Sequence, residues 1–282
     1  EIFEPMENEE QLSFLPLCHI LERSVSVMFP LKSGAVVNFA ESIDTVPENI
    51  REVSPTVFIA VPRIWEKFYS SITILMKDAT FIGKYFYDIS IKTGAKYKEY
   101  YIEGKQPPLI LKLSYRLCNY FVLKNIKKLL GLNKCRYALS GAAPISPELI
   151  NWYLSLGIDM REGWGMTETA GVGTAFYSRE IKLGHVGRAV NQSEVRIADD
   201  GEILFKGPGV FCGYLNKPEQ TKETLIDGWL HTGDVGEMDN YGNIKITDRK
   251  KDIIITAGGK NISPSEIENE LKFSPFVSDA VV

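Results

Sequence analysis

Apolar residues recur along this chain with two different spacings. In the first part, short apolar runs alternate with segments whose apolar positions repeat at helical spacing. The runs predict strands at residues 12–15, 35–40, 57–61, 136–139 and 158–161. One predicted helix begins at Pro62, because proline is favoured at the first position of a helix. Strands that alternate with helices predict a mainly parallel sheet covered on its faces, and therefore an α/β fold.

The stretch from residue 82 to residue 130 interrupts this alternation. It is rich in Tyr and Lys and contains several glycines and a Pro107-Pro108 break. We therefore predict helical hairpins inserted over the sheet. Helical spacing predicts the inward faces of two helices, one early in the chain and one at the end of this insertion. Their members are Ile20, Leu21, Val25, Met28 and Phe29, and Tyr120, Phe121, Ile126, Leu129 and Leu130.

From about Ile181 the apolar runs become short and alternate with polar residues between Gly, Asp and Asn. This texture is typical of an antiparallel sheet or barrel. We therefore predict a partial large domain with a layered αβαβα parallel-sheet core over residues 1–180, and a β-barrel-like subdomain over 181–247. Residues 248–282 are predicted to hold a hinge and the start of a small α+β domain. Its helix would open at Ser263, where Ser-Pro-Ser-Glu forms a capping box.

Composition excludes several other classes of protein. The chain has 282 residues, 44% of them hydrophobic, which is enough for one large core or two ordinary ones. Its net charge is −4 with Lys and Arg spread along it, so no basic face for nucleic acid is expected. Four cysteines without CxxC spacing and three histidines disfavour a zinc site and a disulfide framework, and favour a cytoplasmic protein. No segment has the run of ~20 apolar residues that a membrane-spanning helix needs. We expect a fragment, because the chain starts at Glu1 and ends on an apolar run.

The loop at residues 162–169 carries the first candidate chemistry. Two glycines flank Trp164, so that backbone can approach a flat ligand while an aromatic face is offered. Thr167 supplies a hydroxyl and Glu168 a carboxylate beside it. Such a pair suits a phosphate oxygen and a hard cation, since Mg²⁺ takes one or two carboxylates together with substrate phosphates. The alternative is an ordinary turn with a helix-capping threonine.

Two later segments add candidate chemistry. Asp234 ends the segment 228–234 between glycine turns, where an acid can accept both hydroxyls of a ribose. The alternative for a lone aspartate is an Asx turn that ends a strand. The segment 248–260 joins a charge cluster to an apolar run and a glycine pair. Such a charge cluster is usually a solvated linker. It becomes informative here because it follows the other two segments in a fixed order along the chain.

Taken in order, these segments resemble the adenylate-forming superfamily of acyl-CoA synthetases, nonribosomal adenylation domains and luciferases. The resemblance covers essentially the whole chain and is closest to long-chain fatty-acyl-CoA synthetases. It rests on residues 15–23, 61–67, 140–144, 163–169, 229–234 and 248–268. The nucleotide ligands that it implies are Gly141, Ala142, Ala143, Glu162, Gly163, Trp164, Gly165, Met166, Thr167, Asp234, Ile246 and Arg249.

The resemblance also implies separate roles. Thr167 would bind the AMP phosphate and Glu168 would hold Mg²⁺, and both are predicted to be catalytic together with His19 and Lys251. Lys251 matches the hinge position of the family, and the pair Gly258 and Gly259 matches the loop that approaches the CoA arm. His19 matches a position near the substrate carboxylate; the alternative is a helix-start histidine without a special role.

The implied enzyme is an acid–thiol ligase whose substrates are a fatty acid, ATP and coenzyme A. It forms acyl-AMP and pyrophosphate, and then acyl-CoA and AMP. The family's phosphate loop would precede Glu1 and its catalytic lysine would follow Val282. We therefore expect these residues alone to adenylate poorly, because losing one charge-stabilising donor already costs ~10²–10³ in rate.

The sequence leaves alternatives open for the acyl-binding residues and for the class of protein. Aromatic residues of the insertion, Phe81, Tyr85, Phe86 and Tyr87, are candidates for an acyl tunnel or for ordinary core. A tunnel would favour peripheral contact with a bilayer, although no basic amphipathic helix stands out in the sequence. The rivals are an amino-acid-activating domain, a luciferase-like oxidase and a non-catalytic protein that binds nucleotide or acyl chains. The first lacks support because residues 15–20 contain no Asp to anchor an amine.

Overall fold

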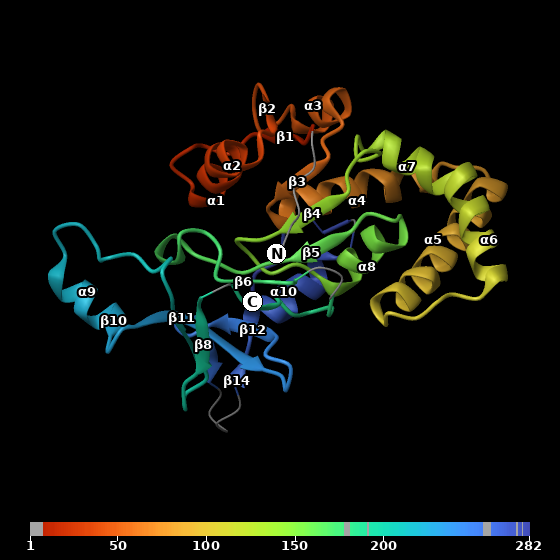
Figure 1. Ribbon diagram of the computed structural model, residues 1–282. Coiled ribbons are helices and arrows are strands. Elements are labelled where there is room, and N and C mark those ends of the chain that lie inside the picture. Colours follow the sequence, from red (N-terminus) through yellow and green to blue (C-terminus); the bar gives the residue numbers. More distant parts are fainter. Residues whose placement is uncertain (1–7, 178–180, 191, 256–260, 275, 278) are drawn as a thin grey trace.

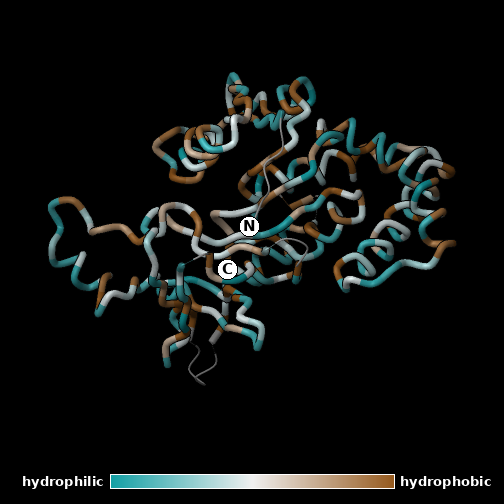
Figure 2. The backbone as a smooth tube through the Cα atoms, viewed as in Figure 1, coloured by the Kyte–Doolittle hydropathy of each residue, from teal (hydrophilic) through white to brown (hydrophobic). Residues whose placement is uncertain are grey.

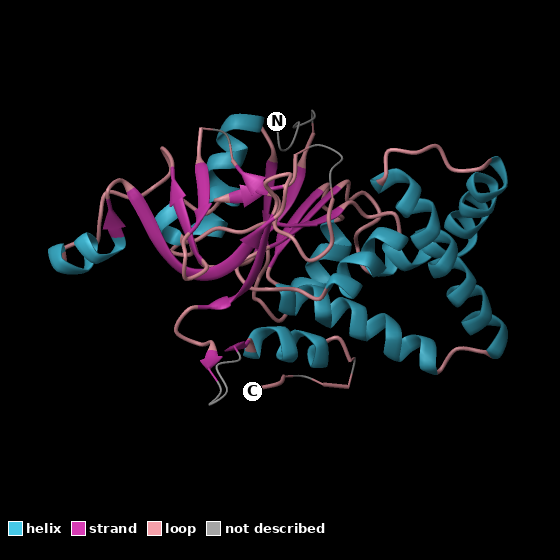
Figure 3. Ribbon diagram, turned by 90° about the horizontal axis from the view of Figure 1, so that it is seen from below, coloured by secondary structure: helices cyan, strands magenta, loops and turns pink. Residues whose placement is uncertain are grey.

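The computed structural model describes residues 8–177, 181–190, 192–255, 261–274, 276–277 and 279–282. Helices and strands separate into two regions, with the long helices at one end of the molecule and the antiparallel strands at the other (Figures 1 and 3). The α/β class predicted from the sequence is confirmed. Among the described residues, no helix is long and apolar enough to cross a bilayer.

The three-stranded parallel sheet is the centre of the first region. Its strands pair in the order β3-β4-β5, and helices follow the first two strands. The bounds are β3 (Val57–Ala60), α4 (Pro62–Lys77), β4 (Tyr137–Ser140), α8 (Pro147–Ser155) and β5 (Met160–Glu162). Pro62 and Pro147 stand at the first turn of their helices, and Ser146 caps the second by accepting a hydrogen bond from the Leu149 amide.

Residues of β3 divide between the two faces of this sheet. Phe58 and Ala60 face a core that also contains Trp65 and Tyr153 from the covering helices. The Phe58 and Trp65 rings meet edge to face at 5.2 Å, and the Tyr153 hydroxyl donates to the Trp65 carbonyl at 2.7 Å. Side chains alternate along a strand, so the neighbours of Phe58 and Ala60 face the opposite side of the sheet. That side carries an apolar pocket described below.

Two smaller parts flank the parallel sheet. The first contains β1 (Glu10–Ser13), α1 (Ile20–Arg23), the π turn η1 (Ser24–Met28), α2 (Phe29–Ser33), β2 (Val36–Phe39) and α3 (Val46–Val53). The second is the predicted insertion, which is helical throughout. It contains α5 (Phe81–Ile102), α6 (Leu109–Cys118), the π turn η2 (Asn119–Leu123) and α7 (Lys124–Leu129).

The inward faces predicted for two of these helices are partly wrong. Leu129 of α7 is 45% exposed. Met28 is 58% exposed, and Tyr120 and Phe121 are 68% and 66% exposed. Each of the last three residues lies in a π turn, where the chain rotates less per residue than in an α-helix, so that helical spacing no longer predicts the buried face. In the first helix the buried side instead includes Glu22, whose carboxylate accepts from the Leu15 amide at 3.0 Å and from Ser26.

The later strands form an antiparallel sheet, one of the two forms that the sequence texture predicted, and among the described strands this sheet stays open. Strand β8 pairs with β9, which pairs with β11, and both β10 and β12 pair with the other edge of β11. The bounds are β8 (Glu194–Ile197), β9 (Glu202–Lys206), α9 (Pro218–Thr224), β10 (Leu225–Ile226), β11 (Trp229–Met238) and β12 (Ile244–Arg249). Among the described strands, none joins β8 to β12, so the sheet keeps two edges.

Short elements complete the chain. They are the single turn η3 (Thr167–Thr169), the strand pairs β6 (Thr174–Ala175) with β7 (Arg188–Ala189) and β13 (Ile254–Ile255) with β14 (Asn261–Ile262), and α10 (Pro264–Lys272). Ser263 caps α10 by accepting from the Glu266 amide, as the capping box predicted. The domain boundaries near residues 180 and 248 stay predictions.

Candidate functional site

The site lies where β4 and β5 end. Ser140 and Glu162, the last residues of these parallel strands, are paired in register. Both loops that carry the sequence motifs therefore leave the same edge of the sheet, which is where open α/β sheets bind ligands. Ala142 of the first loop has a φ of 69°, a left-handed conformation that is unusual for a residue with a side chain.

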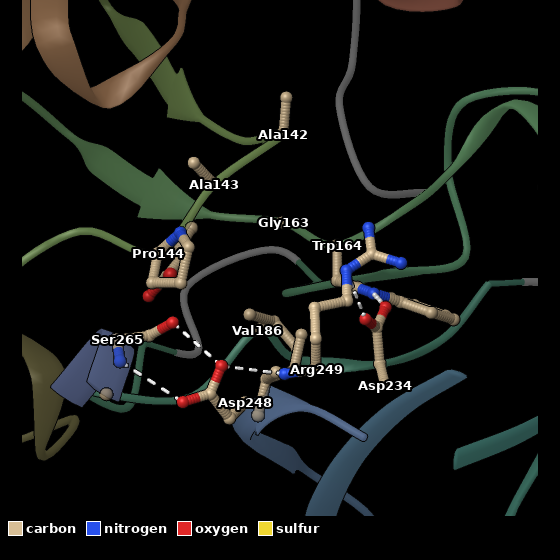
Figure 4. Close-up of a pocket in the computed structure, with 13 residues that line it drawn as sticks. Ala142, Ala143, Pro144, Gly163, Trp164, Val186, Asp234, Asp248, Arg249 and Ser265 are labelled. Atoms are coloured by element: carbon tan, nitrogen blue, oxygen red, sulfur yellow. Dashed lines mark hydrogen bonds and ion pairs between the residues drawn. The ribbon is translucent and has the colours of Figure 1, made fainter. Parts of the chain in front are cut away.

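The two loops form one wall of a slot whose other wall comes from β12 and its neighbours (Figure 4). The slot is lined by Ala142, Ala143, Pro144, Glu162, Gly163, Trp164, Gly184, Val186, Asp234, Ile246, Asp248, Arg249 and Ser265. Eight of these were predicted nucleotide ligands, so the fold brings together residues more than 100 positions apart.

Asp234 and Trp164 join the two walls of the slot. The indole N–H of Trp164 donates to Asp234 Oδ2 at 2.8 Å. Asp234 Oδ1 lies 2.9 Å from Nε of Arg249, its direct cross-strand partner on β12. The carboxylate is 6% exposed, whereas the Arg249 side chain is 51% exposed and can reach a ligand. Burial raises the pKa of the Asp234 carboxyl, while the Trp164 hydrogen bond and the Arg249 charge act in the opposite direction.

The Trp164 ring is held by a close approach of backbone. A Cβ added at Gly173 would come within 2.5 Å of a ring carbon of Trp164, so a side chain at this position would displace the indole. On its other side the ring meets Phe205 edge to face at 6.1 Å, within the core of the antiparallel sheet. The orientation of Trp164 is therefore fixed by packing as well as by its hydrogen bond.

Glu162 supplies a second buried carboxyl to the slot. It is 8% exposed, and burial raises its pKa from 4.5 to about 8, although the Ile145 amide hydrogen-bonds to it and acts in the opposite direction. Near neutral pH this carboxyl carries a proton and can donate a hydrogen bond, whereas a carboxylate can only accept. The sequence placed Glu162 in the slot wall but gave no indication of its protonation.

Asp248 and Ser265 are slot residues that the sequence did not single out. Asp248 is 3% exposed and accepts hydrogen bonds from the Ser263 hydroxyl at 2.7 Å and the Ser265 hydroxyl at 2.8 Å. It also accepts from the amides of Arg249 at 2.8 Å and Ser265 at 3.1 Å (Figure 4). Although burial acts against it, this set of donors lowers the pKa of the Asp248 carboxyl. The carboxylate thus ties the start of α10 to the end of β12.

An apolar pocket adjoins the slot through three shared residues, Ala142, Gly163 and Trp164. Val57 and Ile59 of β3 and Tyr137 and Leu139 of β4 line it from the sheet. Its other lining residues are Leu21, Ser24, Val25, Phe29, Gly141, Gly165, Gly171, Val172, Thr174 and Ala175. Two predicted nucleotide ligands, Gly141 and Gly165, therefore face the apolar pocket and not the slot. An elongated ligand with one polar and one apolar half matches the two cavities together.

Thr167, Glu168 and Met166 follow the slot wall without lining either cavity. Thr167 is exposed, and Glu168 Oε1 accepts a hydrogen bond from the Tyr214 hydroxyl at 2.7 Å. Tyr214 was not found from the sequence, where no signal connects it to Glu168. Within the described residues no group of three or more His, Cys, Asp or Glu could hold a metal ion. Glu168 alone fits only a cation that is also held by a ligand's phosphates.

Two other predicted residues, His19 and Lys251, do not line the slot. His19 caps α1, since its Nδ1 accepts from the Leu21 amide at 3.2 Å, which matches the helix-start alternative. Lys251 is exposed just after β12. Gly258 and Gly259 lie outside the described residues.

The aromatic residues of the insertion do not line the apolar pocket. Phe81, Tyr85 and Phe86 are 85%, 56% and 54% exposed. The Tyr87 hydroxyl instead accepts a hydrogen bond from the indole N–H of Trp152 at 2.9 Å. Phe81, Tyr85 and Phe86 therefore match neither alternative, the acyl tunnel or ordinary core, and the apolar cavity is built from other elements.

Residues 2–215 match the family of AMP-binding enzymes, which covers most of the chain and includes both loops of the slot. The chain therefore belongs to this family. Its relatives and structural neighbours bear out the resemblance seen in the sequence.

Two relatives carry the name of one enzyme class. The chain is 38% identical over 275 residues to the long-chain-fatty-acid–CoA ligase FadD15 of Mycobacterium bovis, covering 97% of this chain and 45% of that protein. It is 35% identical over 296 residues to the long-chain-fatty-acid–CoA ligase ACSBG2 of Gallus gallus, covering 100% of this chain and 38% of that protein. The chain thus spans less than half the length of these curated relatives.

A solved structure confirms the fold. The O-succinylbenzoate coenzyme A synthetase of Bacillus subtilis, in complex with ATP and magnesium ion, is similar with a TM-score of 0.66 and 25% identity. The similarity covers 98% of this chain and 49% of that one.

Proposed function

We propose that the protein carrying this chain activates a fatty acid as its adenylate and transfers the acyl group to coenzyme A. The observation that carries this proposal is the junction of the two cavities at Ala142, Gly163 and Trp164. An acyl adenylate has a nucleotide at one end, an apolar chain at the other and the reactive carbonyl between them. The junction then marks the position of the reacting atoms.

The reaction has two halves. A carboxylate oxygen of the fatty acid attacks the α-phosphorus of ATP, the bond to the pyrophosphate oxygen breaks, and acyl-AMP and pyrophosphate form. The sulfur of coenzyme A, with its proton lost to solvent or a base, then attacks the acyl carbon, and AMP leaves. The first half moves negative charge from a carboxylate oxygen to pyrophosphate, and the second moves it from the coenzyme A sulfur to the phosphate of AMP. Catalysis therefore depends on positioning and on electrostatic stabilisation.

The residues of the chain divide this work between them. Asp234 accepts hydrogen bonds from the ribose hydroxyls, with Arg249 beside it. Trp164 and the Ala142–Ala143 backbone enclose the base, and Thr167 donates to the phosphate. Glu168 is held by Tyr214 and provides one carboxylate for Mg²⁺, which would neutralise phosphate charge when bound.

A long acyl chain is supported by two observations. The pocket beyond the junction is lined mainly by apolar side chains, including Val25, Phe29 and Leu139. The relatives that match nearly the whole chain are named as long-chain-fatty-acid–CoA ligases. Burying each methylene of a longer chain contributes about 0.8 kcal/mol, so selectivity should rise with length until the pocket is filled.

Pyrophosphate release tests this function. The protein that carries the chain is incubated with ATP, Mg²⁺, coenzyme A and fatty acids from butyrate to stearate. We expect release that requires the fatty acid and is greatest with the longer acids. Release with short or aromatic acids alone would overturn the long-chain assignment. The absence of release with every acid, while AMP still binds, would overturn the ligase proposal and favour a protein that binds nucleotides without catalysis.

A further inference from the structure

Positive charge is concentrated in the helical lobe formed by residues 81–130. These residues include ten Lys and Arg but only three Asp and Glu, so the lobe carries a formal charge of +7. The net charge of the whole chain is −4, which leaves −11 for the remainder. The lobe lies at one end of the molecule, at the opposite end from α9 (Figure 1). This concentration is already present in the sequence, because the lobe is one continuous segment of the chain.

The helical run 109–130 is the most polarised part of this lobe. It contains Lys112, Arg116, Lys124, Lys127 and Lys128 and no acidic residue. Its inward side packs on α5 and the core; the Tyr115 and Tyr97 rings stack at 4.1 Å, and Leu123 and Ile126 are buried. The run is therefore anchored on one side only.

The outward side of the same run is apolar. In α6, Leu109 is 72% exposed, Ile110 80%, Leu113 50% and Leu117 61%, and these four recur at helical spacing. Tyr120 and Phe121 of the following π turn η2 are 68% and 66% exposed and extend this apolar surface. Hydrophobic and hydrophilic residues alternate along the helices of the lobe in Figure 2. We call these six residues the α6 stripe. Lys112 and Arg116 are one helical turn apart and follow one side of the stripe.

From this arrangement we propose that the α6 stripe docks the protein onto an anionic lipid surface. Singly exposed apolar residues are ordinary, but a contiguous apolar stripe on one helix face indicates a binding surface. A helix with apolar side chains on one face and flanking cations is suited to the interface of a bilayer, where it lies in the plane of the headgroups. Lys and Arg bury their aliphatic stems there and keep their charges among the headgroup phosphates.

The charge of the lobe selects the kind of surface. Each Lys or Arg near an anionic bilayer contributes about 1 kcal/mol to binding. The run has five without an opposing acid; Arg116, Lys124 and Lys128 are exposed, and Lys112 and Lys127 are half-buried. The exposed acids of the adjacent α5, Asp88 and Glu99, are outnumbered by the exposed Lys84, Lys92 and Lys96 on the same helix. A nucleic acid would also attract these charges, but it would leave the six apolar side chains in water. The stripe therefore favours a lipid partner over a nucleic acid.

This surface is separate from the slot and the apolar pocket, because none of the stripe residues lines either cavity. The proposal therefore does not depend on adenylation, and its test needs no catalysis. The purified chain is sedimented with vesicles of phosphatidylcholine alone or mixed with phosphatidylglycerol. We expect binding to the mixed vesicles, and weaker binding at 1 M salt, where the Debye length falls to about 3 Å.

Two double variants and one control isolate the two contributions. Lys112→Glu with Arg116→Glu should lower partitioning onto the mixed vesicles at least about tenfold, because two attractive charges become repulsive. Leu113→Gln with Leu117→Gln should lower it at least about fivefold, because less apolar surface enters the interface. The control, Leu215→Gln with Lys217→Glu, changes an exposed leucine and lysine at the opposite end of the molecule and should bind as the parent does. Circular dichroism checks that each variant is folded.

Several results would overturn the proposal. These are an absence of binding to mixed vesicles, equal binding by the stripe variants and the parent, or loss of binding in the control. Self-association of the chain that the stripe variants abolish, without any vesicle binding, would assign the stripe to a second copy. Binding of duplex DNA or RNA that the charge variant alone weakens would assign the lobe to nucleic acid.

Discussion

The indole N–H of Trp164 lies 2.8 Å from Asp234 Oδ2, and this hydrogen bond joins a loop of the parallel sheet to a strand of the antiparallel sheet 70 residues later. Each partner is also held from its own side, Trp164 by packing against Gly173 and Phe205 and Asp234 by its ion pair with Arg249. The slot is therefore assembled before any ligand arrives. Its walls cannot move apart without breaking this bond.

Replacing Trp164 with Phe should weaken both the fold and the slot. The substitution leaves a nearly buried carboxylate without one of its donors, and losing a hydrogen bond to a charged group costs about 1.5–3 kcal/mol. Urea unfolding measures this free energy. The matched control is Trp229→Phe, where the ring lies beneath Arg196 and Lys206 and the change should cost less. Equal losses in the two variants would contradict the role given to the hydrogen bond.

Glu162 should make the stability of the chain depend on pH. Between pH 4.5 and about 8 the unfolded chain has an ionised Glu162, whereas the folded chain keeps the proton because burial raises the pKa of that carboxyl. Unfolding then releases a proton, so the free energy of unfolding falls as pH rises through this window. The variant Glu162→Gln stays neutral throughout and should lose that decline.

Urea unfolding of the parent and of the Glu162→Gln variant at pH 5, 6, 7 and 8 measures how the free energy of unfolding of each protein changes with pH. Each unit by which the folded-state pKa of Glu162 is raised corresponds to about 1.4 kcal/mol. Glu223→Gln, an exposed residue of α9, is the control and should follow the parent. Parallel curves for the parent and Glu162→Gln would show that the carboxyl does not carry a proton in the folded chain.

Asp248 should control how firmly α10 is attached. Its carboxylate accepts three hydrogen bonds from Ser263 and Ser265 that join the start of α10 to β12, and a fourth from the Arg249 amide within β12. Removing the acceptor leaves these donors unsatisfied, so the free energy of local opening of α10 falls relative to the parent. In Asp248→Ala we expect amide hydrogen exchange in α10 to be at least about tenfold faster, with exchange in α8 little changed. The exposed Asp199→Ala is the control, and an unchanged rate in α10 would exclude the anchoring role.

Local signals in the sequence were sufficient for most helices and strands. Pro62, Pro147 and Ser146 mark helix starts by their own backbone and side-chain chemistry, and the structure confirms them. The predicted buried faces failed at Met28, Tyr120 and Phe121, because a π turn changes the rotation per residue and leaves no clear mark in the sequence. The same limitation hid the α6 stripe, which becomes visible only when the inward side is known.

Parts of the candidate site could be predicted from the sequence where the residues that meet lie on paired strands. Asp234 and Arg249 are cross-strand partners, and Ser140 and Glu162 end paired strands, so secondary structure alone brings these residues close. Asp248 and Ser265 were missed because their contact depends on how α10 packs against β12, which no periodicity predicts. The choice between an antiparallel sheet and a barrel stayed open for a related reason, since the texture of short strands does not determine whether the two sheet edges meet.

Titration of the chain with AMP is the most direct test of the slot. The Asp234 carboxylate is predicted to accept hydrogen bonds from the ribose hydroxyls. Asp234→Asn keeps an acceptor for Trp164 but removes the charge, so affinity for AMP should fall at least about tenfold. Asp199→Asn, which changes an exposed carboxylate outside the slot, should bind as the parent does. Saturable binding by the parent that Asp234→Asn weakens would support the account. No binding by the parent, or equal affinity in the parent and Asp234→Asn, would contradict it.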